Sequence, residues 1–307
     1  MTPTQLRAFA AVARLGAVKQ AAAELKVSEA AISLHIGQLR KELGDQLFVR
    51  TAGGIAFTPG GLRLASRATE MLGLQDRTIL EVSQAGSGRR LLRVAASSMF
   101  AEHSAPGLIE SFAGRADDLD VELSVHQPRD FAQLLHSRAV DVAVGPQPPD
   151  LPADISCKSV LNYGVVAVAG PDHHLTRIAP SLGELQQHTW LLGPSITSDP
   201  GLVATLIRRL NVPESRQRIF QSHAAALEEA KRGNGIAIAL ASAVSRDLAH
   251  GALKRVHAPH TNAHGVWSIL TLSPREATAA AAEFVRFAAT PRAIQAMRRG
   301  AGVTAGR

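Results

Sequence analysis

The 307-residue chain contains one cysteine, Cys157. A single thiol excludes an internal disulfide framework and a zinc site built from several cysteines. A lone cysteine is more often a small core or surface residue than a redox sensor. We therefore infer no redox role for Cys157 from the sequence.

Long hydrophobic runs are missing as well. Hydrophobic residues make up 46% of the chain, but no apolar run approaches the roughly 20 residues that a membrane span requires. The stretch 1–16 has the pattern of an amphipathic helix, and no small-residue cleavage site follows it. We expect a cytoplasmic protein with no membrane contact, and the length suggests two or three domains.

Patterns typical of catalytic and metal sites do not stand out. The sequence shows no Ser–His–Asp order, no paired carboxylates and no glycine-rich phosphate loop. His257, His260 and His264 have a spacing that could suit a metal, but they lie in a segment rich in turn-forming residues with no cysteine nearby. We interpret them, and His173 and His174, as surface residues. We thus expect no enzyme activity, no cofactor and no metal site.

The segment 19–43 predicts two short helices joined by a tight turn. Ser28 can cap the second helix by accepting a hydrogen bond from a free backbone N–H. Helical spacing predicts a buried stripe made of Ala31, Ile32, Ile36, Leu39 and Leu43. The opposite face carries Glu29, Ala30, Ser33, Leu34, Gly37, Gln38 and Lys41. That face is small, polar and nearly flat, as a helix that enters the DNA major groove requires.

A short hairpin and a long helix follow. Residues 47–51 and 55–58 are two β-prone runs around a glycine turn, which predicts a wing with Arg50 at its base. Thr58 can cap the next helix, with Pro59 at its first position. In that helix Ala65, Leu72 and Ile79 recur every seven residues, beside a second seam that contains Leu62 and Thr69. This coiled-coil spacing favours a partner chain over packing on its own domain.

In this order the residues resemble LysR-type transcriptional regulators. The resemblance covers residues 6–61, including ELGDQLFVR and FTPGG. It implies DNA contacts at Ser28, Glu29, Ala30, Ser33, Leu34, Gln38 and Arg50, to which we add the basic Lys19 and Lys41. It also implies a homodimer formed through the long helix, which the family often extends to a tetramer.

Several positions depart from the family pattern. The family generally has glutamine at Glu29, proline at Ala30 and a basic or polar residue at Leu34, and often arginine at Gly37 and Gly53. A glutamate can accept a hydrogen bond from cytosine N4, and a leucine can contact a thymine methyl group. The resemblance therefore predicts the binding mode but not the base sequence that is read.

Positive charge is concentrated in the same region. The chain carries a formal net charge of +7, and residues 1–90 contain twelve Lys and Arg against seven Asp and Glu, an excess of five. Such a basic segment would supply phosphate affinity that does not depend on sequence.

After a short hinge at 85–88 the pattern changes to alternating strands and helices, which predicts an α/β domain with largely parallel sheets. The expected strands are Leu91–Ala96, Asp120–Val125, Asp141–Val144, Gly164–Ala169, Trp190–Leu192, Arg218–Gln221, Gly235–Leu240 and Val266–Leu272. The expected helices are Ala101–Arg115, Asp130–Ala139, Pro200–Leu210, His223–Arg232, Ala241–His250 and Arg275–Ala289.

These segments resemble the effector-binding domain of the same family, which has the two-subdomain fold of periplasmic solute-binding proteins. The best matching stretches are DVELSVHQ, AVDVAVG and SHAAALEEAKRGNGIAIAL. We expect a winged helix–turn–helix domain at 1–58, a linker helix with hinge at 59–88 and an effector-binding domain at 89–307. Subdomain I would span about 91–161 and 267–290, and subdomain II about 162–266. The tail after Ala289 is expected to be frayed.

Ligands of open α/β sheets bind beyond the carboxyl ends of the strands. Polar residues at such places are the candidate effector contacts, namely Ser97, Ser98, Gln127, Arg129, Thr197 and Ser222. A small polar or anionic effector would bind there, with Arg129 as its charge partner. The alternative is that these serines only cap helices.

The sequence as a whole predicts a transcriptional regulator that binds promoter DNA and responds to a small molecule. Two alternatives remain open at this point. One is an enzyme or transport component built on the solute-binding fold. The other is a DNA-binding architectural protein without a ligand.

Overall fold

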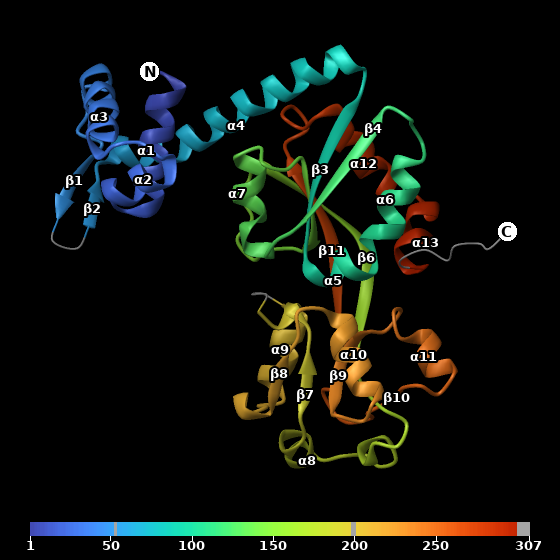
Figure 1. Cartoon of the computed structure of the whole chain (residues 1–307). Coiled ribbons are helices and arrows are strands. Elements are labelled where there is room, and N and C mark those ends of the chain that lie inside the picture. The colour runs from blue at the N-terminus through green and yellow to red at the C-terminus, as the bar shows by residue number, and fades with distance from the viewer. Residues whose placement is uncertain (52–53, 198–200, 300–307) are drawn as a thin grey trace. The chain divides into compact units, whose positions relative to one another are not determined.

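The computed structural model describes residues 1–51, 54–197 and 201–299 (Figure 1). Two compact units are present. The first consists of Met1–Ser87 together with His136–Ala139, and the second contains Gly88–Leu135 and the chain after Ala139. Among the described residues, no helix has the length and apolar character needed to cross a membrane.

The first unit is a helical domain with a two-stranded hairpin. Its elements are α1 (Pro3–Leu15), α2 (Val18–Leu25), α3 (Glu29–Leu43), β1 (Phe48–Thr51), β2 (Gly54–Phe57) and α4 (Pro59–Ser87). A small core joins them, with Phe9, Val12, Ala21 and Leu39 fully buried. The hairpin is antiparallel, with Phe48 opposite Phe57. Helix–turn–helix and wing are therefore confirmed as elements.

Caps fix where these helices begin. Ser28 caps α3 as predicted, since its Oγ accepts from the Ala31 N–H at 3.1 Å. Thr58 likewise accepts from the Gly61 N–H at 2.9 Å. The Thr58 hydroxyl donates in turn to Asp45 Oδ1 at 2.7 Å, and this bond, followed by one from the Leu47 N–H, lowers the pKa of Asp45. The start of α4 is thus tied to the loop that precedes the wing.

Two predictions in this unit need correction. Leu43 was expected in the buried stripe of α3, but 43% of it is exposed, because the core ends at Leu39 and Leu43 lies beyond it. The predicted hinge at 85–88 is mostly helical, since α4 continues to Ser87, and the next residue, Gly88, has a positive φ of 67°. Gly88 is where the chain can turn without a Cβ clash.

The predicted seam of α4 is divided between two environments. Ala65 and Leu72 pack against the core of their own unit, which is the alternative that the spacing left open. Leu62 and Ile79 of the predicted seam remain well exposed, as do Met71, Leu74 and Val82 of the same helix. The exposed apolar residues are the ones that can face a partner chain.

The second unit is built on one mixed sheet with the strand order β4-β3-β5-β11-β6-β9-β7-β8, and β10 pairs with β6. The strands are β3 (Arg90–Ala96), β4 (Leu119–Val125), β5 (Val142–Pro146), β6 (Ile155–Ala169), β7 (Trp190–Leu192), β8 (Gln217–Ile219), β9 (Ile236–Leu240), β10 (Lys254–Arg255) and β11 (Asn262–Leu272). β3 is parallel to β4 and β5, and β7 is parallel to β8 and β9.

Two long antiparallel strands, β6 and β11, join the two halves of this sheet (Figure 1). They carry an irregularity in register between Trp267 and Ser268. The sequence placed only 164–169 and 266–272 in strands. The additional residues of β6, from Ile155 to Tyr163, include several exposed polar side chains, so they lack the continuous apolar run of a buried strand. The prediction of largely parallel sheets holds for each half but not for this central pair.

Helices cover both halves. They are α5 (Ser98–His103), α6 (Ala105–Ala113), α7 (Phe131–His136), α8 (Leu182–Gln187), α9 (Leu202–Arg209), α10 (His223–Lys231), α11 (Ser245–Ala249), α12 (Ala279–Ala288) and α13 (Pro291–Arg299). Short 3₁₀ turns are η1 (Pro128–Asp130), η2 (His174–Thr176), η3 (Pro194–Thr197) and η4 (Glu214–Arg216).

Two helix predictions were wrong. The single helix expected at 101–115 is two helices that meet at Ser104. Pro106 explains the break, since it has no N–H for the preceding turn and its ring clashes there. In the tail expected to be frayed, Pro291–Arg299 form α13, which buries Ala293 and Met297 in the main core, and the rest of the tail (300–307) lies outside the described residues. The apolar residues of α13 are few, but they fall on one face.

Candidate nucleic-acid interface and effector cleft

The outer face of α3 is exposed as predicted. Glu29, Ala30, Ser33, Leu34, Gly37, Gln38 and Lys41 all lie on the solvent side. Leu34 is 60% exposed, although burying a leucine in the protein would be favourable. Ile32, Ile36 and Leu39 hold the opposite face in the core. The helix therefore offers a continuous surface whose DNA contacts remain a prediction.

Gln38 is partly committed inside the protein. Its Oε1 accepts a hydrogen bond from Gln5 Nε2 at 2.9 Å, and Gln5 in turn belongs to the capping box that begins α1. The carbonyl of Gln38 is thus held in place, and its NH₂ group is the part left to donate to a base or phosphate.

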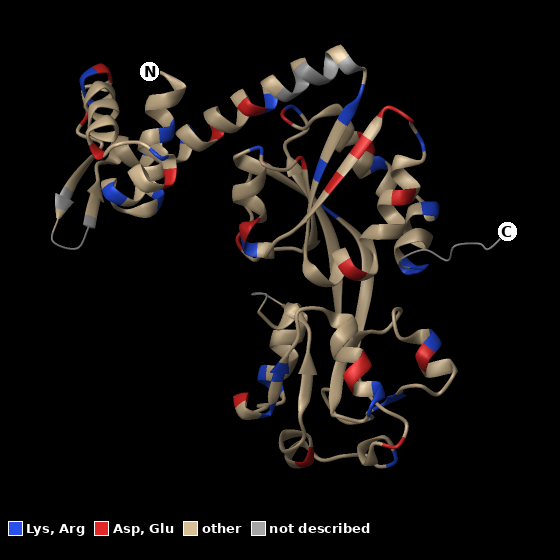
Figure 2. Cartoon of the chain, in the orientation of Figure 1, with Lys and Arg blue, Asp and Glu red and all other residues tan. Residues whose placement is uncertain are grey.

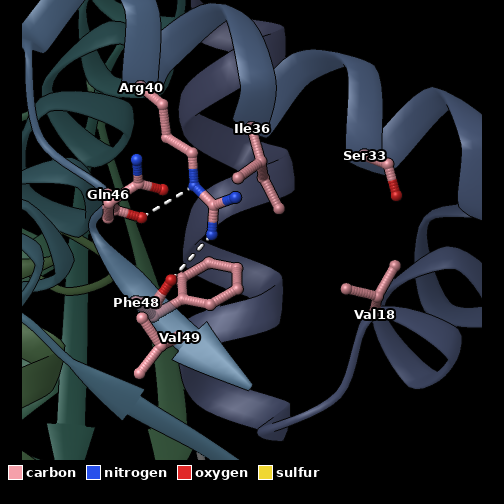
Figure 3. Close-up of a pocket in the computed structure, with 7 residues that line it drawn as sticks. All are labelled: Val18, Ser33, Ile36, Arg40, Gln46, Phe48 and Val49. Carbon is pink, nitrogen blue, oxygen red and sulfur yellow. Dashed lines mark hydrogen bonds between the residues drawn. The ribbon is translucent and has the colours of Figure 1, made fainter.

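A groove of about 260 Å³ lies between the helix pair and the wing (Figure 3). Arg40 lies in it and connects α3 with the wing. Its Nε donates to the Gln46 carbonyl and its Nη2 to the Phe48 carbonyl, both at 2.7 Å. The guanidinium carbon also lies 4.9 Å from the centre of the Phe48 ring. Sequence reasoning counted Arg40 only as a charge and missed this role. Ser33 lies at the other side of the same groove.

The remaining predicted contacts are basic. Lys19 on α2 and Lys41 on α3 are exposed. Arg50 lies in β1 opposite Ile55, and its side chain is outside the described residues. Basic and acidic segments alternate along α3 and α4 (Figure 2), so the positive excess of this unit is distributed.

In the second unit, several predicted effector residues meet at one cavity. Ser97 and Ser98 line it together with Ser195, Tyr163 and Trp267. Its volume is about 20 Å³, which is room for about one water molecule. Ser97 Oγ is buried and has no hydrogen-bond partner among the described residues. Gln127 and Thr197 do not line it, but Gln127 Nε2 donates to Thr197 Oγ1 at 3.2 Å and so joins the two halves of the unit.

Two predicted effector residues lie elsewhere. Arg129 does not line this cavity, and its mostly exposed side chain is 3.9 Å from Asp130. Its role as charge partner stays a prediction without a cavity to support it. Ser222 caps α10 by accepting from the Ala225 N–H at 3.1 Å, as the capping alternative stated.

Sequence reasoning missed a hydrogen-bonded group at the edge of the cavity. Glu102 of α5 accepts from the backbone N–H of His223 at 2.9 Å and of Ala224 at 2.7 Å. Its Oε2 is also 2.8 Å from His223 Nδ1, and His223 Nε2 is 2.9 Å from Ser195 Oγ. His223 is only 3% exposed. More than a hundred residues separate Glu102 from His223, so no local spacing could reveal the pair.

The carboxylate form of Glu102 is strongly favoured. Burial alone would raise its pKa, but the hydrogen bonds from the His223 side chain and from the two backbone N–H groups outweigh burial and lower the pKa to about 2. The neighbouring His103 has its pKa lowered, first by burial. Ligand atoms of Glu102, His103 and His223 lie within 4.8 Å of one another. This grouping could hold a metal, but both carboxylate oxygens already accept hydrogen bonds.

Two family models match the chain. Residues 3–62 match the bacterial regulatory helix-turn-helix protein of the lysR family, and residues 85–291 match the LysR substrate binding domain. The chain belongs to the LysR family. It is a LysR-type transcriptional regulator with an effector-binding domain, which favours the regulator interpretation over both alternatives left open by the sequence.

Similar proteins agree with this assignment to the LysR family. An uncharacterized HTH-type transcriptional regulator of Mycobacterium tuberculosis is 53% identical over 306 residues, covering 99% of this chain and 95% of that protein. Among solved structures, full-length LysG from Corynebacterium glutamicum with bound arginine superimposes with a TM-score of 0.60 at 19% identity, covering 98% and 99% of the two chains. CbnR complexed with its target DNA gives 0.59 at 21% identity, covering 94% and 99%. These structures share the two-part LysR fold.

Proposed function

We propose that this LysR-type regulator binds promoter DNA by placing α3 in the major groove, with the wing beside it. The observation that carries this proposal is the outer face of α3, which leaves Leu34 and six small or polar residues exposed on a helix anchored by Ile32, Ile36 and Leu39. Glu29, Ala30, Ser33, Leu34 and Gln38 would meet bases or the groove edge. Ser28, Lys19, Lys41 and Arg50 would meet the backbone.

We further propose the division into a DNA-binding domain at 1–58, a linker at 59–88 and an effector-binding domain at 89–307. Exposed apolar residues of α4 would form the dimer contact, namely Leu62, Met71, Leu74, Ile79 and Val82. A dimer would place two recognition helices on inverted half-sites. A regulator that acts on chromosomal DNA would work in the cytoplasm.

The effector would bind between the two halves of the second unit, at the cavity that Ser97 and Ser195 line. Hydroxyl groups, a buried tyrosine and a buried tryptophan suit a small polar molecule there. Such a molecule can shift the arrangement of the protein only by its differential affinity for two arrangements. A bound effector would thereby alter how dimers engage and bend the promoter.

Quantitative footprinting of the full-length protein on the DNA upstream of its own gene tests this function. We expect protection of a limited promoter segment and no comparable protection of a scrambled fragment. Ser33→Ala should weaken binding while circular dichroism stays unchanged. Lys254→Ala, an exposed basic residue of β10, is the matched control and should bind as wild type does. Equal protection of both fragments would contradict the proposal.

A further inference from the structure

The two halves of the second unit are joined at the cavity edge by a carboxylate of the chain itself. Glu102 comes from α5, which follows β3 in the first half. The groups that bind it, the backbone N–H groups of His223 and Ala224 and the His223 ring, begin α10 in the second half. A helix N-terminus with free N–H groups is an anion site. Here that site is filled by Glu102.

The adjoining cavity is too small for an effector. Its volume of about 20 Å³ compares with the roughly 300–1,000 Å³ of ordinary ligand pockets. Ser97 nevertheless indicates that a ligand can bind here. Its Oγ is buried, it belongs to a residue that lines the cavity, and it has no hydrogen-bond partner among the described residues. Buried hydroxyls normally have a hydrogen-bond partner. A ligand that reached Ser97 would have to part the two halves at Glu102 or Thr197.

The charges around the cavity also indicate that the groups bound to Glu102 are the anion site. Neither lysine nor arginine appears among the residues that line the cavity. The donors that could receive an anion are therefore those now bound to Glu102. The Ser195 hydroxyl, 2.9 Å from His223 Nε2, contacts the other side of the same ring. Three donors on one carboxylate make a strong, charge-assisted set.

We propose that Glu102 is a built-in carboxylate ligand that keeps the effector cleft closed, and that the effector is a small carboxylate that takes its place. The proposal rests on the proposed function in identifying the cleft. Displacement would free Glu102 and leave the backbone N–H groups of His223 and Ala224 and the His223 ring bound to the carboxylate of the effector. No covalent step is involved. Ser97 would then hydrogen-bond another polar group of the same molecule.

Chemical rescue by acetate tests the carboxylate site directly. Glu102→Ala empties the site in the full-length protein, and we expect its Tm to fall by roughly 2–4 °C. Sodium acetate should then raise the Tm of this variant saturably, whereas sodium chloride at equal ionic strength should not. Wild type and Glu110→Ala, which removes an exposed carboxylate of α6, should show no difference between the two salts. If Glu102→Ala does not fold, Glu102→Ser replaces it, because serine leaves room for acetate and can accept one N–H bond.

A second readout follows the closure itself. Trp267 lines the cavity and is buried against Tyr163, with ring centres 4.3 Å apart. Acrylamide should quench the fluorescence of Glu102→Ala more than that of wild type, and acetate should reverse the difference. The other tryptophan, Trp190, is fully buried, donates to the Leu185 carbonyl and does not line the cavity, so we expect the change to come from Trp267.

The outcomes separate this inference from the regulator function. Two results would overturn the role of Glu102 in closing the cleft, even if promoter binding is intact. One is an equal response of Glu102→Ala to acetate and to chloride, and the other is a Tm of Glu102→Ala equal to that of wild type. Acetate rescue in a protein that binds no promoter would support the carboxylate site and refute the proposed function.

Discussion

The outer face of α3 and the effector cleft differ in how far apart in the sequence their residues lie. The α3 face is built from 15 consecutive residues with one cap and one buried stripe. The cleft brings Ser97, Glu102, Ser195 and His223 together from both halves of a mixed sheet. One surface follows from helical periodicity, and the other exists only after the sheet has formed. We expect substitutions in the cleft to cost folding stability and substitutions on α3 to cost DNA affinity.

The largest expected effect is on stability. His223→Ala would remove the ring that contacts Glu102 and Ser195 and would leave both groups without that partner. We expect the free energy of unfolding to fall by about 2–4 kcal/mol. Urea denaturation measures the change. His257→Ala, at an exposed histidine, is the control and should lie within about 0.5 kcal/mol of wild type.

The pH dependence of folding stability tests the cleft separately from the outer face of α3. The pKa of Glu102 is about 2 in the folded chain, below its usual 4.5. Its contribution is therefore complete above pH 4.5 and is lost as the pH falls toward about 2. Burial lowers the pKa of His103. Its contribution to folding stability is therefore also lost as the pH falls, beginning near its ordinary pKa of 6.5. Thermal unfolding between pH 2 and 7 should show a shallower acid decline in Glu102→Gln. Identical slopes in both proteins would contradict the lowered pKa of Glu102.

Arg40→Ala tests whether Arg40 holds the wing in position beside α3. Loss of its two bonds to the Gln46 and Phe48 carbonyls should loosen the wing and weaken promoter binding by about 1–2 kcal/mol. The salt dependence of binding should stay the same, because Arg40 is bound to the wing and not to phosphate. Arg40→Lys retains the charge but not both bonds, so it should weaken binding as well. A reduced salt slope would instead show that Arg40 contacts the DNA backbone.

Lys41→Ala should have the smallest effect. If its ammonium group reaches a phosphate, the salt slope of promoter binding falls by about one, and binding weakens about equally on all sequences. Titrations at several salt concentrations measure the slope. The substitution should leave the preference between promoter and scrambled DNA unchanged.

Prediction from sequence succeeded where structure is local. Ser28 and Thr58 were placed as caps because their side chains act within three residues, and the hairpin was read from two short runs. It failed where distant segments decide the structure. The N-terminal part of β6 is stabilised by pairing with β11, and α13 by burying Ala293 and Met297 in a core made elsewhere. Glu102 gave no signal because its partners, 121 and 122 residues away, become neighbours only in the folded sheet.

Glu29→Gln tests most directly whether the outer face of α3 reads bases. Glutamate accepts from cytosine N4, whereas glutamine pairs with adenine through two hydrogen bonds. Selection of binding sites from a random DNA pool should therefore show that this variant changes its preference from cytosine to adenine at one position of each half-site. Identical selected sequences for the variant and wild type would contradict the placement of α3 in the major groove.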